Sequence, residues 1–149
     1  NSGVFDAPGF TLMNTGNADM TVTGGTVKCG GIKTGYALMA AGSAAKLTVS
    51  GGDIEAIQSI GGAQVNISGG SVYCEGVYYA LYNGGGNTSI SGGYFYSPTG
   101  KNIYVASGTV KTTGGYFSDK SAPLESGYKF QDISVTENGN QYNYQVVSE

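Results

Sequence analysis

The ten residues from Leu47 to Ala56 read LTVSGGDIEA, and they carry the clearest indication of the fold. Apolar and polar residues alternate on both sides of its diglycine, which is the period of a β-strand with one buried face. The diglycine predicts a tight corner, because glycine adopts backbone angles that other residues disfavour. Four other stretches share this frame: MTVTGGTVKC (20–29), VNISGGSVYC (65–74), TSISGGYFYS (88–97) and VKTTGGYFSD (110–119).

The spacing of these copies indicates a repeat architecture. With Ser2-Gly3 as a degenerate first copy, successive second glycines are 22, 27, 18, 23 and 22 residues apart. A strand pattern repeated at about this length, with three short strands per copy, predicts a β-solenoid whose turns stack about 4.8 Å apart. We therefore expect an all-β, single-stranded parallel β-helix of about six coils over residues 1–118. No helical period of 3.6 residues persists anywhere in the chain.

Residues 119–149 depart from the repeat and are expected to form a C-terminal cap. Pro123 breaks the coil. The stretch ISVTENGNQYNYQVV (133–147) alternates around Asn138-Gly139, a pair favoured in the tight turns of β-hairpins. The sequence thus predicts two parts, coils over 1–118 and a cap with a β-hairpin over 119–149.

The composition disfavours several classes of function. The 149 residues include no histidine and no arginine, and the formal net charge is −3. No basic patch is available to neutralise phosphates, so nucleic acid is not an expected partner. Without histidine there is no imidazole for a catalytic triad or a histidine-ligated zinc site, and we expect no metal and no cofactor. The longest apolar stretch, 36–41, is too short to insert into a membrane.

The repeated phrases carry a family resemblance. TVTGGTV, LTVSGGDI, VNISGGSV and SISGGYFYS resemble the right-handed parallel β-helix (pectin-lyase-like) repeats of bacterial secreted and cell-surface proteins. The tail from Gly114 onward resembles the terminal piece of adhesin-like surface repeats of gut bacteria. The resemblance covers nearly all of the chain. It implies an extracellular, bacterial cell-surface module of a larger surface protein that adheres without catalysis to a host or environmental glycan or glycoprotein, such as mucin or an immunoglobulin.

The two cysteines, Cys29 and Cys74, occupy the same position of their copies. The coil that carries Ala56 lies between them, so they are expected two rungs apart, at roughly 9.6 Å. This separation exceeds the reach of a disulfide. We predict two buried thiols outside any disulfide, which act as small hydrophobic residues.

Asp53 and Glu55 form the one close carboxylate pair on an expected outward face. Parallel β-helix lyases and hydrolases generally use clustered aspartates, so the resemblance leaves open a carbohydrate-active enzyme fragment in which this pair serves as acid and base. Lys28, however, is one coil before Glu55 in the same column. An exposed ion pair between the two is the simpler interpretation, and no catalytic residue is assigned.

The candidate ligand-binding residues are four tyrosines after the diglycine corners. Tyr94 and Tyr116 share one outward column, and Tyr73 and Tyr96 share the next. Together they predict a two-by-two patch that offers apolar area with polar tips to a sugar or a protein. The alternative is an aromatic ladder that only stabilises the stacking of the coils. Four further tyrosines are expected on the adjacent face or corner: Tyr78, Tyr79, Tyr82 and Tyr104.

Rows of hydroxyl residues precede the diglycine corners, beginning with Thr21 and Thr23. Regular threonine rows on a β-solenoid resemble ice-binding faces, but serine replaces threonine in half of these rungs and Lys111 interrupts the row. Most such rows are solvated strand residues. Ice binding and a purely structural stalk therefore remain minor alternatives.

Overall fold

The computed structural model describes residues 3–30, 35–75, 79–98 and 101–149. Within these residues no helix is long and apolar enough to cross a membrane. The described strands are β1 (Val4–Asp6), β2 (Leu12–Asn14), β3 (Asp19–Lys28), β4 (Leu38–Ala41), β5 (Lys46–Glu55), β6 (Ile57–Ile60), β7 (Gln64–Ile67), β8 (Ser71–Tyr73), β9 (Leu81–Ile90), β10 (Tyr94–Tyr96), β11 (Ile103–Thr112), β12 (Tyr116–Phe117), β13 (Tyr128–Glu137) and β14 (Asn140–Ser148).

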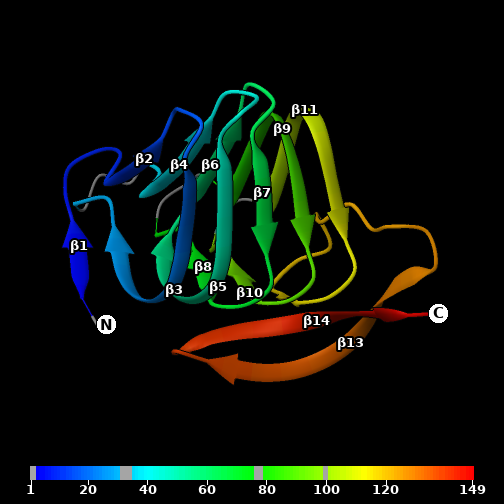
Figure 1. Ribbon diagram of the computed structural model, residues 1–149. Helices are drawn as coiled ribbons and strands as arrows, with labels where there is room; N and C mark the ends of the chain where they lie inside the picture. The colour runs from blue at the N-terminus through cyan, green and yellow to red at the C-terminus, as the bar shows by residue number, and fades with distance from the viewer. Residues whose placement is uncertain (1–2, 31–34, 76–78, 99–100) are drawn as a thin grey trace.

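The strands β1 to β12 wind into a parallel β-solenoid of about five turns, as Figure 1 shows. The repeat predicts about six coils, but the outermost copies contribute only short strands, three residues in β1 and two in β12. The solenoid has three faces, and each face consists of parallel strands. The groove face contains β1, the second halves of β3 and β5, and then β8, β10 and β12. The flat face contains the first halves of β3 and β5, β7 and the second halves of β9 and β11.

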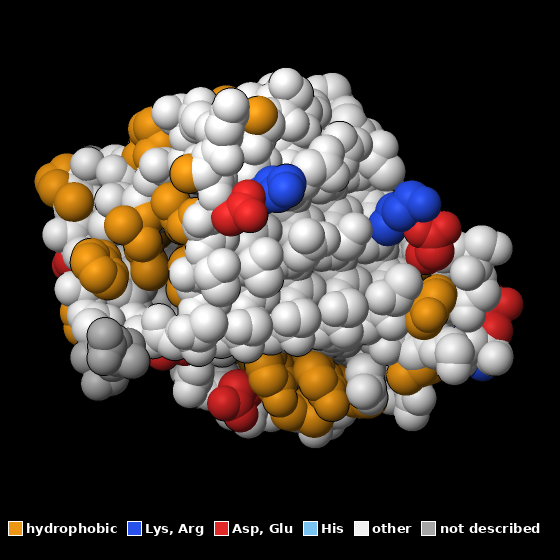
Figure 2. Space-filling model, in the orientation of Figure 1, with side chains coloured by type: hydrophobic (Ala, Val, Ile, Leu, Met, Phe, Trp, Pro, Cys, Tyr) orange, Lys and Arg blue, Asp and Glu red, His pale blue; other side chains and the backbone are white. Residues whose placement is uncertain are grey.

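The third face contains β2, β4, β6 and the first halves of β9 and β11. The flat face is turned toward the viewer in Figure 2 and is largely polar. The predicted hydroxyl row is in register there, because Thr21 pairs with Thr48 and the column continues through Asn66, Ser89 and Lys111.

The diglycine corners need glycine for two separate reasons, as the pair Gly51-Gly52 shows. A side chain at Gly51 would collide with the carbonyl oxygen of Thr23 in the preceding coil. Gly52 has a φ of 94°, and a Cβ there would lie 2.9 Å from the carbonyl oxygen of Gly25. The first position therefore requires space and the second requires left-handed backbone.

The core consists of stacked ladders of like residues. One ladder runs through Val27, Ile54, Val72, Phe95 and Phe117, all at most 2% exposed. The rings of Phe95 and Phe117 stack with centroids 5.0 Å apart. The ladder begins at Phe5, which is 55% exposed because it belongs to the first described rung and is covered on one side only. No coil buries its own inward face, so each rung depends on its neighbours.

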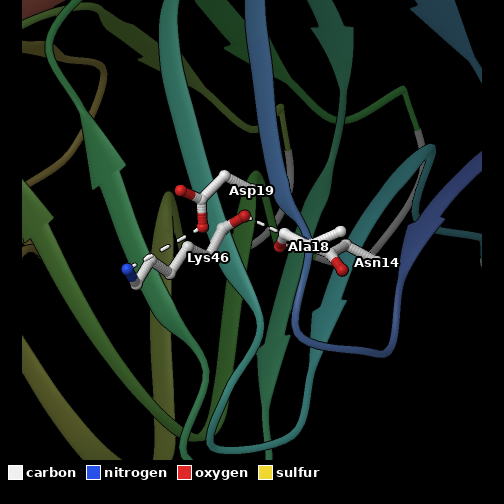
Figure 3. Close-up of polar contacts among 4 residues, drawn as sticks. All are labelled: Asn14, Ala18, Asp19 and Lys46. Atoms are coloured by element: carbon white, nitrogen blue, oxygen red, sulfur yellow. Dashed lines mark hydrogen bonds and ion pairs between the residues drawn. The ribbon is translucent and has the colours of Figure 1, made fainter.

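Two asparagines satisfy backbone carbonyl groups inside the solenoid. Asn14 is buried, and its side-chain amide donates to the carbonyl oxygens of Ala18 (2.7 Å) and Lys46 (2.8 Å), next to the ion pair between Lys46 and Asp19 (Figure 3). Asn83 lies in the same column three rungs later and makes the equivalent bonds to Gly86 and Ser107. Buried carbonyl groups at a corner are costly without such partners.

The C-terminal strands β13 and β14 form the predicted hairpin. Asn138 and Gly139 have φ values of 50° and 77°, as a tight turn of this type requires. The hairpin does more than cap the end of the coil stack. β14 pairs antiparallel with β12, and the hairpin then runs back along the groove face with its tip toward the N-terminal coils (Figure 1).

Candidate binding groove

The four candidate tyrosines occupy the predicted columns of the groove face. Tyr94 pairs with Tyr116, and their rings stack with centroids 4.7 Å apart at an interplanar angle of 12°. Tyr96 pairs with Tyr73 one column away. The two-by-two arrangement that the repeat frame predicts is therefore present in the strand register.

The patch is half-buried because the hairpin lies over it. Tyr142 of β14 is fully buried, and its ring packs edge-on against Tyr94 (5.2 Å) and Tyr96 (6.3 Å). The side-chain amide of Gln145 donates to the hydroxyl oxygen of Tyr116 at 3.3 Å. Apolar side chains accordingly gather along the lower edge of Figure 2. Much of the predicted patch is therefore an interface within the chain, and only part of it is open to a ligand.

A groove of about 520 Å³ remains between the groove face and the hairpin tip. Two of the four candidate tyrosines line it, together with three charged side chains and two amides of the hairpin: Tyr73, Tyr96, Lys28, Asp53, Glu75, Asn138 and Asn140. A more open hollow of about 480 Å³ adjoins the groove and is bordered by Tyr94 and Glu137. The combination of ring faces, amides and carboxylates is suited to binding a polar ligand with apolar faces.

Asn138 separates the groove from the adjoining hollow. Its side-chain amide donates to Oδ1 of Asp53 at 3.1 Å and to the hydroxyl oxygen of Ser71 at 3.3 Å. All three residues border both spaces. The two hydrogen bonds hold the hairpin tip against the third and fourth copies of the repeat and so fix the width of the groove.

Burial and nearby carboxylates together raise the pKa of two tyrosines on the groove face. Burial, followed by the carboxylates of Glu55, Glu75 and Asp53, holds the pKa of Tyr73 well above its ordinary value of 10.0. In the adjoining hollow, burial and then Glu137 raise the pKa of Tyr94. Burial and a neighbouring anion both disfavour the charged form of a phenol, so the two causes act in the same direction, and burial is the larger one.

Glu55 does not have the role that the sequence indicates. It is only 4% exposed, and its Oε2 accepts a hydrogen bond from the backbone N–H of Cys29 at 2.9 Å. The predicted ion pair between Lys28 and Glu55 is not among those that the described residues form, which join Lys46 to Asp19, Lys111 to Glu125 and Lys120 to Asp132. Glu55 therefore satisfies the backbone of the preceding coil, and only Asp53 of the predicted carboxylate pair lines the groove.

The cysteines lie where the repeat frame puts them. Cys29 and Cys74 are both buried, and the described structure contains no disulfide between them. Burial, and then the charge of Glu55, raises the pKa of Cys29 to about 12. The thiolate is the reactive form of cysteine, so this environment does not activate Cys29 as a nucleophile.

A second aromatic cluster lies on the third face. The rings of Tyr79 and Tyr104 stack with centroids 4.4 Å apart, Tyr82 lies 5.7 Å from Tyr104, and Tyr36 lies 5.9 Å from Tyr82. The predicted member Tyr78 lies outside the described residues. Tyr82 and Tyr104 follow one another in register along one column, so part of this cluster is a stacking ladder.

Several groove residues could not be selected from the sequence. Asn138 and Asn140 reach the groove only because the hairpin folds back over the solenoid, and Glu75 lines it from the bend after β8. The Asn138-Gly139 pair marks the turn but not the surface on which the turn rests. Hydrophobic alternation in both hairpin strands, with tyrosines at 142 and 144, is the one sequence signal that the hairpin would bury a face against another surface.

The described residues contain no group of three metal-ligating side chains that could hold an ion. Comparison with family models, curated proteins and solved structures gives no match for this chain. The architecture therefore rests on the repeat and on the strand register, and the candidate ligand site rests on the geometry of the groove.

Proposed function

We propose that the chain is a non-catalytic binding module that takes a glycan, free or attached to a glycoprotein, in the groove beneath the hairpin tip. The observation that carries the proposal is the presence of the rings of Tyr73 and Tyr96 and the amides of Asn138 and Asn140 around one groove of about 520 Å³. Sugar rings offer apolar C–H faces and polar hydroxyl rims. Tyrosine rings and side-chain amides are complementary to these two kinds of surface.

The groove is held by elements that are already ordered. Tyr73 and Tyr96 belong to stacked strands, and Asn138 is anchored to Asp53 and Ser71. A ligand that enters such a site orders few protein side chains, which reduces the entropic cost of binding. The adjoining hollow beside Tyr94 provides room for a chain of sugars to extend beyond the groove.

The same proposal includes a location and a role. We place the module outside the cell, on a bacterial surface protein, where it would bind a host or environmental glycan or glycoprotein such as mucin or an immunoglobulin. The support is the resemblance of the repeats to those of bacterial surface proteins, together with the groove and its polar and aromatic lining. Adhesion modules of this kind need a shaped surface and no reactive group.

A glycan and glycoprotein array probed with the wild-type chain is the first test, followed by titration of the strongest ligand. Tyr96→Ala and Tyr73→Ala should each weaken binding about tenfold, because each removes an aromatic face from the groove. Tyr82→Ala is the matched control, since it truncates a half-buried tyrosine on the third face and should bind like wild type. Equal affinity of all three variants, each shown to be folded, would remove the groove as the binding site.

Saturable binding must also be separated from turnover. Incubation with each bound polysaccharide should release no new chain ends. If new ends appear and Asp53→Asn abolishes them, the carbohydrate-active alternative replaces the binding module. Absence of saturable binding to every glycan and glycoprotein tested would instead favour a structural stalk.

A further inference from the structure

The charge of the groove points to a narrower class of ligand than glycans in general. Asp53 and Glu75 line the groove with a single cation, Lys28, and Glu137 borders the adjoining hollow. Among the ion pairs of the described residues, none involves Asp53 or Glu75. Two carboxylates without a cationic partner in a hollow surface attract a positive charge from solution.

This part of the groove contains both acceptors for N–H donors and aromatic rings. Oδ1 of Asp53 and the hydroxyl oxygen of Ser71 already accept hydrogen bonds from the amide nitrogen of Asn138. The rings of Tyr73 and Tyr96 lie in the same groove. Aromatic faces attract a nearby cation through the ring quadrupole, and the effect adds to that of the carboxylates.

We infer that the groove selects saccharides that carry protonated amino groups, and that Asp53 and Glu75 receive the ammonium groups while Tyr73 and Tyr96 contact the sugar faces. Acidic glycans are disfavoured, because their carboxylates or sulfates would face the same anionic groups. This inference rests on the proposed function and restricts its ligands to one class of glycan. A basic peptide would satisfy the charges, but the ring faces of the groove match the flat C–H faces of a sugar chain better.

The test uses glucosamine oligomers and N-acetylglucosamine oligomers of equal length, titrated calorimetrically into the full chain at a pH where the free amines are protonated. The amine-bearing oligomer should bind about tenfold more tightly, as two partly exposed ion pairs allow. Its affinity should fall steeply from low salt to about 0.5 M salt, while binding of the acetylated oligomer should change little. Equal affinity for both oligomers would overturn the inference and leave the proposed function intact.

Charge-neutral variants locate the effect. Asp53→Asn and Glu75→Gln should each weaken binding of the amine-bearing oligomer about two- to fivefold, and should weaken it more than they weaken binding of the acetylated oligomer. Asp132→Asn is the matched control, because it removes the same charge from an exposed position outside the groove. If the control weakens binding as much as Asp53→Asn, the effect is one of net charge and the inference is wrong.

Two further outcomes distinguish failure of the selection for amines from failure of the proposed glycan-binding function. An oligolysine peptide that binds while neither saccharide does would replace the saccharide with a basic peptide and overturn both proposals. Binding of the acetylated oligomer alone, lost in Tyr96→Ala, would keep the glycan site and overturn the selection for amines.

Discussion

The side-chain amide of Asn138 donates a hydrogen bond of 3.1 Å to the carboxylate of Asp53, 85 positions earlier in the chain. This contact joins the tip of the C-terminal hairpin to the third copy of the repeat. The contact closes one side of the groove. Asn138 also donates to the hydroxyl oxygen of Ser71, which belongs to the next copy of the repeat. The hairpin is therefore a wall of the candidate site as well as a cover for the end of the solenoid.

The contribution of this contact is measurable. Asn138→Gly removes the side-chain amide, and glycine tolerates the φ of 50° at this position. The free energy of unfolding should therefore fall by about 1 kcal/mol through loss of the hydrogen bonds. A double-mutant cycle with Asp53→Ala, read by chemical denaturation, should give a coupling of about 0.5–1 kcal/mol. Additive effects of the two substitutions would show that the tip is not anchored through this pair.

The corner glycines give a prediction with an internal control. Gly51→Ala should lower the free energy of unfolding by about 3 kcal/mol or more, because the new Cβ would overlap the carbonyl oxygen of Thr23. Gly24→Ala changes the equivalent residue of the preceding corner, where nothing described lies within 4 Å of the new Cβ, and should change stability by less than about 1 kcal/mol. Equal losses in the two variants would contradict the stacking of the corners.

The phenylalanine ladder makes a similar comparison possible. Phe95→Ala removes a ring that is fully buried between two rungs and should cost about 3–5 kcal/mol. Phe5→Ala truncates the same position in the first described rung, where the ring is 55% exposed, and should cost less than about 1 kcal/mol. Thermal and chemical denaturation of both variants would measure the two losses. Equal losses would contradict the greater burial of Phe95 relative to Phe5.

The raised pKa of Cys29 predicts a loss of stability in alkali. The unfolded thiol ionises near its ordinary value of 9.0, whereas the folded thiol ionises at about 12. The stabilisation is therefore complete below pH 9 and declines as the pH rises from about 9 toward 12. Denaturation at pH 8 and pH 10.5 should show a smaller decline for Cys29→Ala than for wild type; an equal decline would mean that Cys29 is not the group responsible.

Alkylation offers an independent check on the same thiol. Cys29 should react with iodoacetamide in the native protein at pH 8 far more slowly than in denaturant, because the neutral buried form is unreactive. Rapid modification of Cys29 in the native protein, identified by mass spectrometry, would show that the coil interior is open to reagent.

The solenoid could be predicted in detail because its evidence is local and repeated. Alternation fixes which residues of LTVSGGDIEA face inward, and five copies in one frame fix which residues stack. The columns Ile54 to Val72 and Tyr94 to Tyr116 follow directly and appear in the strand register. The hairpin turn at Asn138-Gly139 is equally local, since a two-residue turn is encoded by its own residues.

The groove could not be predicted, because it depends on how two separately encoded parts pack together. The bonds from Asn138 to Asp53 and Ser71 span 85 and 67 positions. Glu55 illustrates the same limit at a single residue. Its outward position in the strand predicts exposure, yet it is buried and bound to the backbone of Cys29, since burial depends on what covers a face as well as on which face a residue occupies.

The most direct test of the binding groove is a map of backbone amide chemical-shift changes on titration of the isotopically labelled chain with the best saccharide ligand. If a saccharide binds in the groove, saturable changes should occur at Tyr73, Glu75, Tyr96 and Asn138, and Tyr82 and Tyr104 should be unaffected. Changes confined to the third face or to the flat face, at concentrations that saturate binding, would contradict binding in the groove.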